Sequence, residues 1–149
     1  MIKILMVCLG NICRSPLAQG ILESKINSKD VFVDSAGTAA YHVGNLPDER
    51  SIAVARKYGL DITNQRARKF IVDDFNTFDL IYVMDESNYQ NIVSLAKSKE
   101  DIEKVKFILE EKTANKNVNV PDPYYGGDKG FENVYKMLDE VCEIISEKI

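Results

Sequence analysis

Residues 2–22 read IKILMVCLGNICRSPLAQGIL, and this stretch decides the fold class of the chain. It begins with a short apolar run, Ile2 to Val7, whose composition is typical of a buried β-strand. Ser15 and Pro16 then predict a helix, with the serine as N-cap and the proline at the first helical position. A buried strand followed by a helix is the first half of a parallel βαβ unit.

The rest of the chain repeats this alternation of strand and helix. Short apolar runs predict three further strands, and capping residues or apolar faces at three- and four-residue spacing predict three further helices. The predicted strands are 31–33, 80–84 and 105–109, and the predicted helices are 48–58, 86–96 and 131–145. We therefore expect an α/β fold of three layers, in which helices cover both faces of a central four-stranded parallel sheet. We expect residues 1–149 to form a single domain.

The composition is that of an ordinary globular protein. Hydrophobic residues make up 45% of the chain and charged residues 28%, and the formal net charge is −4. Because acidic and basic residues are interspersed, we expect neither nucleic acid nor a membrane as a partner. The N-terminal apolar run is too short for a secretion signal, and no stretch approaches the length of a membrane span. Three cysteines without such a signal indicate reduced thiols and a cytoplasmic location.

The loop between the first strand and the first helix carries the candidate chemistry. It starts with the thiol of Cys8 and ends with the guanidinium of Arg14, and Gly10 allows its backbone to curl. A helix N-terminus offers free N–H groups to an anion, and arginine adds a planar fork of donors suited to phosphate oxygens. The same positive field favours the thiolate, which is the nucleophilic form of cysteine. The loop therefore predicts attack of Cys8 on phosphorus through a phosphocysteine, with Ser15 donating a hydrogen bond to the sulfur.

The residues alone are compatible with other roles for the cysteines. Cys8 could be a small hydrophobic residue at the end of a buried strand, which is the usual role of a cysteine. A zinc site is a weaker alternative, because Cys8 and Cys13 have only Cys142 and His42 as further soft ligands. Cys142 falls on the apolar face of the last helix, so we expect it to pack in the core. We expect no metal and no other cofactor.

The sequence resembles the low-molecular-weight protein tyrosine phosphatase family over nearly its whole length. The resemblance rests on residues 8–15, 33–38, 84–88 and 121–126, which read CLGNICRS, VDSAGT, MDESN and PDPYYG. A cysteine followed six residues later by an arginine occurs in unrelated folds. Its position near the N-terminus combined with the distal Asp-Pro-Tyr-Tyr segment is specific. The fold that the resemblance implies is flavodoxin-like.

The resemblance implies a role for each residue of the candidate site. Asp122, which alone reads as a turn residue before proline, would be the general acid that protonates the leaving phenolate, beside the nucleophile Cys8 and the phosphate clamp Arg14. The loop would bind phosphate, and tyrosines would form aromatic walls for a phenyl ring. These binding residues are Leu9, Gly10, Asn11, Ile12, Cys13, Ser15, Tyr41, Tyr124 and Tyr125. Ser35 would brace the loop and Asp85 would support the site, although each could also be a capping residue.

The implied activity is hydrolysis of phosphotyrosine in protein substrates by a monomeric enzyme that phosphate and other oxyanions inhibit. Two other activities share the fold. A thiol-dependent arsenate reductase needs relay cysteines in mid-chain, and this chain has none between Cys13 and Cys142. A protein-arginine phosphatase tends to carry threonine where this chain has Ile12, so the isoleucine favours phosphotyrosine. A phosphate-binding module without catalysis is disfavoured, because the nucleophile, the clamp and the acid are all present.

The resemblance also leaves specific expectations outside the catalytic residues. It implies that Cys13 can protect an oxidised Cys8 by forming a disulfide with it. Gln65 stands where some relatives carry a structural histidine, so the bracing of the loop can differ here. We expect His42 to be a solvated loop residue. We expect Arg66 and Arg68 to be surface charges.

Overall fold

The structure is a computed structural model that describes residues 1–112, 118–125 and 127–149. Within these residues, four parallel strands form one sheet in the order β2-β1-β3-β4. The strands are β1 (Ile2–Cys8), β2 (Val31–Gly37), β3 (Leu80–Val83) and β4 (Val105–Phe107). From β1 the chain passes first to β2, on one side of β1, and later to β3, on the other side. In folds of this kind, such a reversal of strand order places a ligand crevice at the carboxyl ends of β1 and its neighbours. This confirms the predicted parallel sheet and its flavodoxin-like order.

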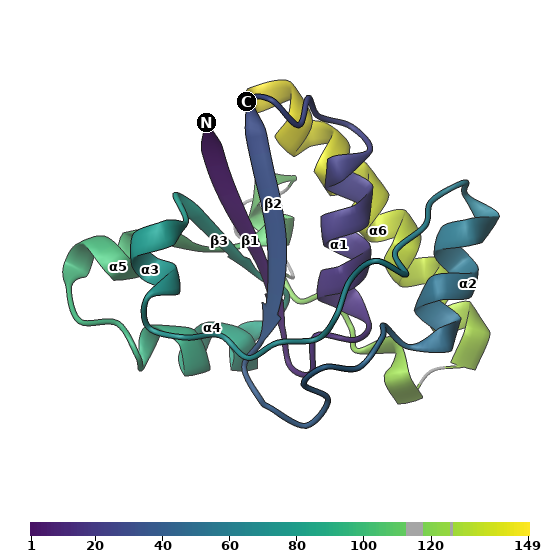
Figure 1. Ribbon diagram of the computed structural model, residues 1–149, viewed down its shortest axis with the longest axis horizontal. Coiled ribbons are helices and arrows are strands. Elements are labelled where there is room, and N and C mark those ends of the chain that lie inside the picture. Colours follow the sequence, from purple (N-terminus) through teal and green to yellow (C-terminus); the bar gives the residue numbers. More distant parts are fainter. Residues whose placement is uncertain (113–117, 126) are drawn as a thin grey trace.

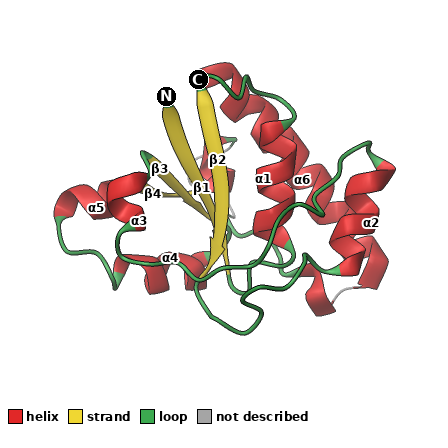
Figure 2. Ribbon diagram, in the orientation of Figure 1, coloured by secondary structure: helices red, strands yellow, loops and turns green. Residues whose placement is uncertain are grey.

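Helices cover both faces of the sheet, as predicted (Figure 1). Helices α1 (Arg14–Glu23) and α6 (Gly127–Lys148) pack together on one face, and α2 (Glu49–Lys57) packs against α6. Helices α3 (Asp74–Thr77) and α4 (Glu86–Val93) cover the opposite face, and α5 (Lys99–Glu103) lies beside β4 (Figure 2). Two 3-10 helices span Ile108–Glu111 and Pro123–Tyr125. In the described ranges we find no helix with the length and apolar composition needed to cross a bilayer.

Strand β1 separates two apolar clusters, because successive side chains of a strand point to opposite faces of the sheet. Ile4 and Met6 belong to the cluster beneath α1 and α6, whereas Leu5 and Val7 belong to the cluster on the other face. All four side chains are fully buried. Cys8 continues the first series, so its sulfur lies on the side of α1 at the carboxyl edge of the sheet. The core thereby fixes the position of the candidate nucleophile.

The start of α1 differs from the predicted one. The helix begins at Arg14, and its N-cap is Cys13, which makes no side-chain capping bond. The prediction that Ser15 is the N-cap is therefore wrong. The hydroxyl of Ser15 lies instead against the sulfur of Cys8. Arg14 consequently sits in the first turn, where its side chain can reach the same anion site as the backbone N–H groups of the helix.

Other differences concern the ends of elements and two short helices. Strand β2 extends to Gly37, so Ser35 lies within it, and β4 ends at Phe107, before a 3-10 turn. Helix α4 ends at Val93 and not near residue 96. The short helices α3 and α5 were not predicted, because four and five residues carry too little periodic pattern.

Candidate active site

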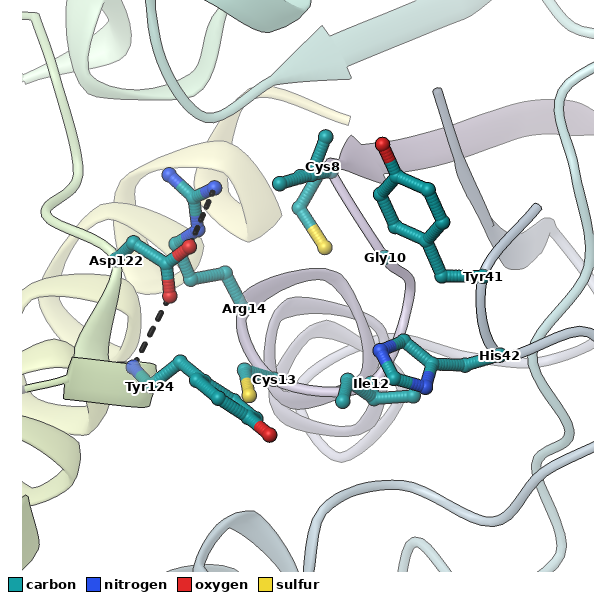
Figure 3. Close-up of a pocket in the computed structure, with 10 residues that line it drawn as sticks. Cys8, Gly10, Ile12, Cys13, Arg14, Tyr41, His42, Asp122 and Tyr124 are labelled. Atoms are coloured by element: carbon teal, nitrogen blue, oxygen red, sulfur yellow. Dashed lines mark hydrogen bonds and ion pairs between the residues drawn. The ribbon is translucent and has the colours of Figure 1, made fainter. Parts of the chain in front are cut away.

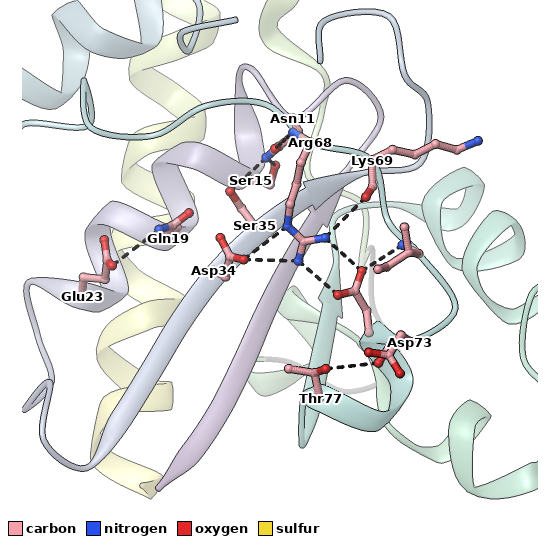
Figure 4. A network of polar contacts seen from close by, with 12 residues as sticks. Asn11, Ser15, Gln19, Glu23, Asp34, Ser35, Arg68, Lys69, Asp73 and Thr77 are labelled. Atoms are coloured by element: carbon pink, nitrogen blue, oxygen red, sulfur yellow. Dashed lines mark hydrogen bonds and ion pairs between the residues drawn. The ribbon is translucent and has the colours of Figure 1, made fainter. Parts of the chain in front are cut away.

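The loop from Cys8 to Arg14 turns at Asn11 (Figure 4). Asn11 has a φ of 57°, in the left-handed region that asparagine adopts more readily than most residues. Its side-chain nitrogen donates to Ser15 Oγ at 2.8 Å and to Ser35 Oγ at 2.9 Å. Its Oδ1 accepts the backbone N–H of Arg68 at 3.0 Å. One buried amide thus ties the loop to α1, to β2 and to the segment around residue 68.

Two glycines allow neighbouring segments to approach this loop closely. A Cβ on Gly37 would lie 2.8 Å from the carbonyl oxygen of Leu9 and 3.1 Å from that of Ala39. Both are backbone atoms, so the contact could not be relieved by moving a side chain. A Cβ on Gly10 would lie 3.0 Å from Cδ2 of His42. The end of β2 and the segment after it therefore pack directly on the loop.

The sulfur of Cys8 is buried and has a specific polar neighbour. Cys8 is 2% exposed, and its Sγ lies 3.0 Å from Ser15 Oγ. The Ser15 hydroxyl already accepts a hydrogen bond from Asn11, so its own proton is available for the sulfur. A hydrogen bond of this kind stabilises a negatively charged sulfur.

Arg14 is held in one orientation beneath the loop. Its side chain is 3% exposed, and Nη1 donates to Asp85 Oδ2 at 2.6 Å and to the carbonyl of Val120 at 2.9 Å. Burial alone would lower the pKa of Arg14, but the charge on Cys8 and the Asp85 carboxylate raise it above the usual value. Asp85 also caps α4, accepting the N–H of Asn88 at 2.9 Å. Arg14 therefore stays charged, and its plane is fixed by groups from two other segments.

Asp122 reaches the same place from a distant part of the sequence. Its Oδ2 lies 3.9 Å from Nη2 of Arg14, and its Oδ1 accepts the backbone N–H of Tyr124 at 3.0 Å. The side chain of Asp122 is 34% exposed, so water can reach it. Figure 3 shows its carboxylate on the side of the pocket that faces Arg14, with Cys8 nearby.

These side chains border one pocket of about 290 Å³. Most predicted site residues line it, and the exposed rings of Tyr41 and Tyr124 stand at its mouth (Figure 3). The lining residues are Cys8, Leu9, Gly10, Ile12, Cys13, Arg14, Tyr41, His42, Asp122 and Tyr124. Four other predicted residues lie behind the lining and bond to the loop or to Arg14, namely Asn11, Ser15, Ser35 and Asp85. The side chain of Tyr125 and the whole of Gly126 lie outside the described residues.

The structure corrects the expectations for His42 and Arg68. His42 lines the pocket beside Gly10 and is not a purely solvated residue. Arg68 is not a simple surface charge, since its guanidinium lies 3.2 Å from Asp34 Oδ2 and 3.0 Å from Asp74 Oδ2 (Figure 4). The adjacency of His42 to Tyr41 in sequence is a signal that could have placed it near the site. Arg66 is exposed, as expected.

The second loop cysteine differs from the first in its environment. Cys13 is 5% exposed, and burial, followed by the charges of Asp48, Cys8 and Asp122, raises its pKa to about 12. Cys13 is therefore a neutral thiol near neutral pH, and no disulfide joins it to Cys8. Across the described part of the chain, no three His, Cys, Asp or Glu side chains are grouped as a metal site would require.

The family model described as low molecular weight phosphotyrosine protein phosphatase matches residues 3–149 of the chain. The chain belongs to this family. The resemblance drawn from the sequence motifs is thus confirmed. A putative low molecular weight protein-tyrosine-phosphatase of Synechocystis sp. is 44% identical to this phosphatase over 144 residues, covering 94% of this chain and 91% of the relative. The low molecular weight phosphotyrosine protein phosphatase of Gallus gallus is 38% identical over 150 residues, with 98% and 94% coverage.

Solved structures show the same likeness in three dimensions. A crystal structure of a protein tyrosine phosphatase from Entamoeba histolytica, with Hepes in its active site, superposes on this phosphatase with a TM-score of 0.92. The two chains are 36% identical, and the match covers 99% of this chain and 96% of the other. Because the match is almost complete, the pocket of this phosphatase lies in a fold that solved tyrosine phosphatases share.

Proposed function

We propose that this protein hydrolyses phosphotyrosine in protein substrates through a covalent phosphocysteine at Cys8. The observation that carries the proposal is the convergence of Cys8, Arg14 and Asp122 on one pocket at the N-terminus of α1. Cys8 and Arg14 share one loop, whereas Asp122 comes from a distant part of the sequence, so no local feature brings all three together. A thiol, a guanidinium fork and a carboxylic acid are the three groups that such a reaction needs.

The first step transfers the phosphoryl group to the enzyme. The thiolate of Cys8 attacks phosphorus, and the bond between phosphorus and the phenolic oxygen breaks. Asp122, protonated at this point, gives its proton to that oxygen, so the product leaves as neutral tyrosine. The backbone N–H groups at the start of α1 and the Arg14 fork bind the phosphoryl oxygens, whose charge is spread over them in the transition state.

The second step returns the enzyme to its starting state. Asp122 is now a carboxylate and takes a proton from a water molecule as the water oxygen attacks phosphorus. The bond between phosphorus and sulfur breaks, and inorganic phosphate and the Cys8 thiolate are released. Ser15, whose hydroxyl lies 3.0 Å from the sulfur, stabilises the thiolate as a leaving group.

The lining of the pocket suits an aryl phosphate. Ile12 and Leu9 present apolar side chains, and Tyr41 and Tyr124 present rings at the mouth. A phenyl ring can stack on or meet the edge of such rings. The apolar side chain of Ile12 offers no hydrogen bond to a guanidinium, which supports phosphotyrosine as the substrate over phosphoarginine.

The test compares turnover of a phosphotyrosine peptide, a phosphoarginine protein and p-nitrophenyl phosphate, each without added metal. We expect turnover of the first and the third, with inorganic phosphate and vanadate as competitive inhibitors. The Cys8→Ser variant should lose turnover but still bind vanadate, because the backbone cradle and Arg14 are unchanged. Turnover by Cys8→Ser close to that of the wild type would overturn the nucleophile assignment, and preferential turnover of phosphoarginine would overturn the substrate assignment.

A further inference from the structure

Arg50, in the first turn of α2, touches both segments that build the pocket. On one side it bonds to Asp48, and on the other it bonds to Tyr124, which lies two residues after Asp122. Arg50 does not line the pocket. It therefore joins the phosphate loop to the segment that carries the candidate acid without touching the reacting groups.

The contact with the phosphate loop runs through Asp48. The backbone N–H of Asp48 donates to the carbonyl of Ile12 at 2.8 Å, so the start of α2 is anchored to the loop. The carboxylate of Asp48 caps α2 by accepting the N–H of Arg50 at 2.8 Å. The same carboxylate accepts Nε of Arg50 at 3.1 Å and Nη2 at 3.2 Å. This paired contact fixes the plane of the guanidinium.

The contact with the acid segment runs through Tyr124. Nη1 of Arg50 donates to the carbonyl of Tyr124 at 3.1 Å, and the guanidinium carbon lies 5.2 Å from the centre of the Tyr124 ring. The same carbon lies 4.5 Å from the centre of the Phe131 ring in α6. Both distances are within the range of cation–π attraction. Arg50 thus contacts both the backbone carbonyl and the ring of Tyr124, and so restricts the position of this residue.

Tyr124 in turn holds Asp122. Its backbone N–H donates to Asp122 Oδ1 at 3.0 Å, which leaves Oδ2 directed toward Arg14. A shift of Tyr124 would therefore rotate or displace the carboxylate relative to Cys8. Displacements of about 1 Å at a reacting group can cost about 10²-fold in rate.

We propose that Arg50 is a positioning residue for proton transfer by Asp122. The inference rests on the proposed role of Asp122 as the general acid. Arginine is required because three separate acceptors, two on Asp48 and one on Tyr124, are met by three nitrogens of one rigid fork. A lysine could satisfy the charge but could not hold the two segments at a fixed distance.

The first test uses leaving groups of different quality. Arg50→Met should lower kcat/KM for a phosphotyrosine peptide by about 10-fold, a part of the 10²–10⁴-fold that a positioned acid supplies. The ratio kcat/KM is the quantity to compare, because it covers only the steps up to phosphoryl transfer to Cys8, whereas hydrolysis of the phosphocysteine is common to all substrates. The loss should be much smaller for p-nitrophenyl phosphate, whose leaving group needs less protonation, and the inhibition constant for vanadate should change little. Arg50→Lys should recover only part of kcat/KM. The matched control is Arg56→Met, an exposed arginine of the same helix, which should behave as the wild type.

The second test places Arg50→Met in the Asp122→Asn background. If Arg50 acts through Asp122, the double variant should be no slower than Asp122→Asn alone. A multiplicative loss in the double variant, or an equal loss for both leaving groups in Arg50→Met, would overturn the inference. If Asp122→Asn itself lost the same factor for every leaving group, the acid assignment would fail instead, so the two failures are distinguishable.

Asp48→Asn is a milder variant that we expect to keep the fold. Asparagine can still cap α2, but it lacks the charge and one of the oxygens that hold the guanidinium. We expect the same dependence on the leaving group as in Arg50→Met, with a smaller loss. Thermal unfolding of each variant shows whether it is folded. If Arg50→Met is unfolded, a loss in Asp48→Asn that is independent of the leaving group overturns the inference.

Discussion

At the scale of single residues, the chemistry of Arg14 depends on its shape as well as on its charge. Arg14→Lys keeps the charge beside Asp85, so we expect the variant to fold. An ammonium is a point charge and cannot bind two phosphoryl oxygens in one plane. We therefore expect kcat/KM for a phosphotyrosine peptide to fall by at least about 10²-fold, the loss that removal of one transition-state donor typically causes. Steady-state kinetics near the wild-type values would show that Arg14 is not the phosphate clamp.

The two loop cysteines should respond differently to peroxide. Peroxide oxidises the Cys8 thiolate to a sulfenic acid and is itself reduced to water. Attack by the sulfur of Cys13 then forms a disulfide and releases a second water. Because the pKa of Cys13 is raised to about 12, its thiolate fraction is small at neutral pH and grows as pH rises. We expect thiol reductant to restore wild-type activity after peroxide treatment, with better protection at higher pH.

The control for this prediction is Cys13→Ser, which should be active when reduced but irreversibly inactivated by peroxide. Mass spectrometry should find the Cys8–Cys13 disulfide only in the wild type. Equal recovery of both proteins after reduction would show that Cys13 has a packing role alone.

Single residues were predictable from the sequence where their role depends on neighbours along the chain. The loop from Cys8 to Arg14 is contiguous, so its residue types already indicate a thiol within a phosphate cradle. The contacts of Arg68 with Asp34 and of Arg50 with Tyr124 join distant segments. No local pattern distinguishes such arginines from solvated charges.

At the scale of elements, the junction of β1 and α1 was predicted almost completely. The apolar run and the helix signal placed the loop correctly, because both depend on local periodicity. The N-cap was wrong, since the hydroxyl of Ser15 bonds to the sulfur of Cys8 across the loop. A capping preference is a local tendency, and a functional contact outweighs it at this position.

The close approach of β2 to the loop gives a prediction at this scale. In Gly37→Ala the new methyl group would press on the carbonyl oxygens of Leu9 and Ala39, so the loop must move. We expect a destabilisation of about 1–3 kcal/mol, the usual cost of overpacking. In this variant kcat should fall by more than the fraction of unfolded protein accounts for. Urea unfolding and kinetics on a phosphotyrosine peptide measure the two effects.

Gly130→Ala is the matched control for this substitution. At Gly130, in α6, the nearest atom to an added Cβ is 3.7 Å away, an ordinary contact. Alanine there should stabilise the helix by about 0.5–1 kcal/mol. If Gly37→Ala were as stable and active as Gly130→Ala, the close packing of β2 on the loop would not matter for function.

At the scale of the whole molecule, the sequence predicted the layers because alternating strands and helices leave few arrangements. It did not by itself place Asp122 in the pocket. Residues 120–122 are irregular and lead into a single 3-10 turn, and contacts with Arg14 and Arg50 position this segment. Only the family resemblance assigned Asp122 its role, because long-range contacts of loops leave no periodic pattern in the sequence.

Because of its buried thiols, we expect the stability of the whole molecule to depend on pH in the alkaline range. Cys142, on the buried face of α6, is fully buried, and its thiol donates to the carbonyl of Ala18 in α1 at 3.8 Å. Burial raises the pKa of Cys142 from 9.0 to about 12. Between these two values the folded state holds a proton that the unfolded state has lost. The contribution of this thiol to the free energy of unfolding is therefore fully present below pH 9 and is lost as pH rises toward 12.

We expect the free energy of unfolding to fall above pH 9, with Cys142 contributing about 1.4 kcal/mol per pH unit, the slope for one proton. Urea unfolding at a series of pH values measures this slope. Cys142→Ala removes the contribution, so its slope above pH 9 should be shallower by that amount, whatever its stability at pH 7. Below pH 8 the stability curves of the two proteins should run parallel, because the thiol is then protonated in both states. Equal slopes for the two proteins in the alkaline range would show that Cys142 ionises in the folded protein as easily as in the unfolded chain.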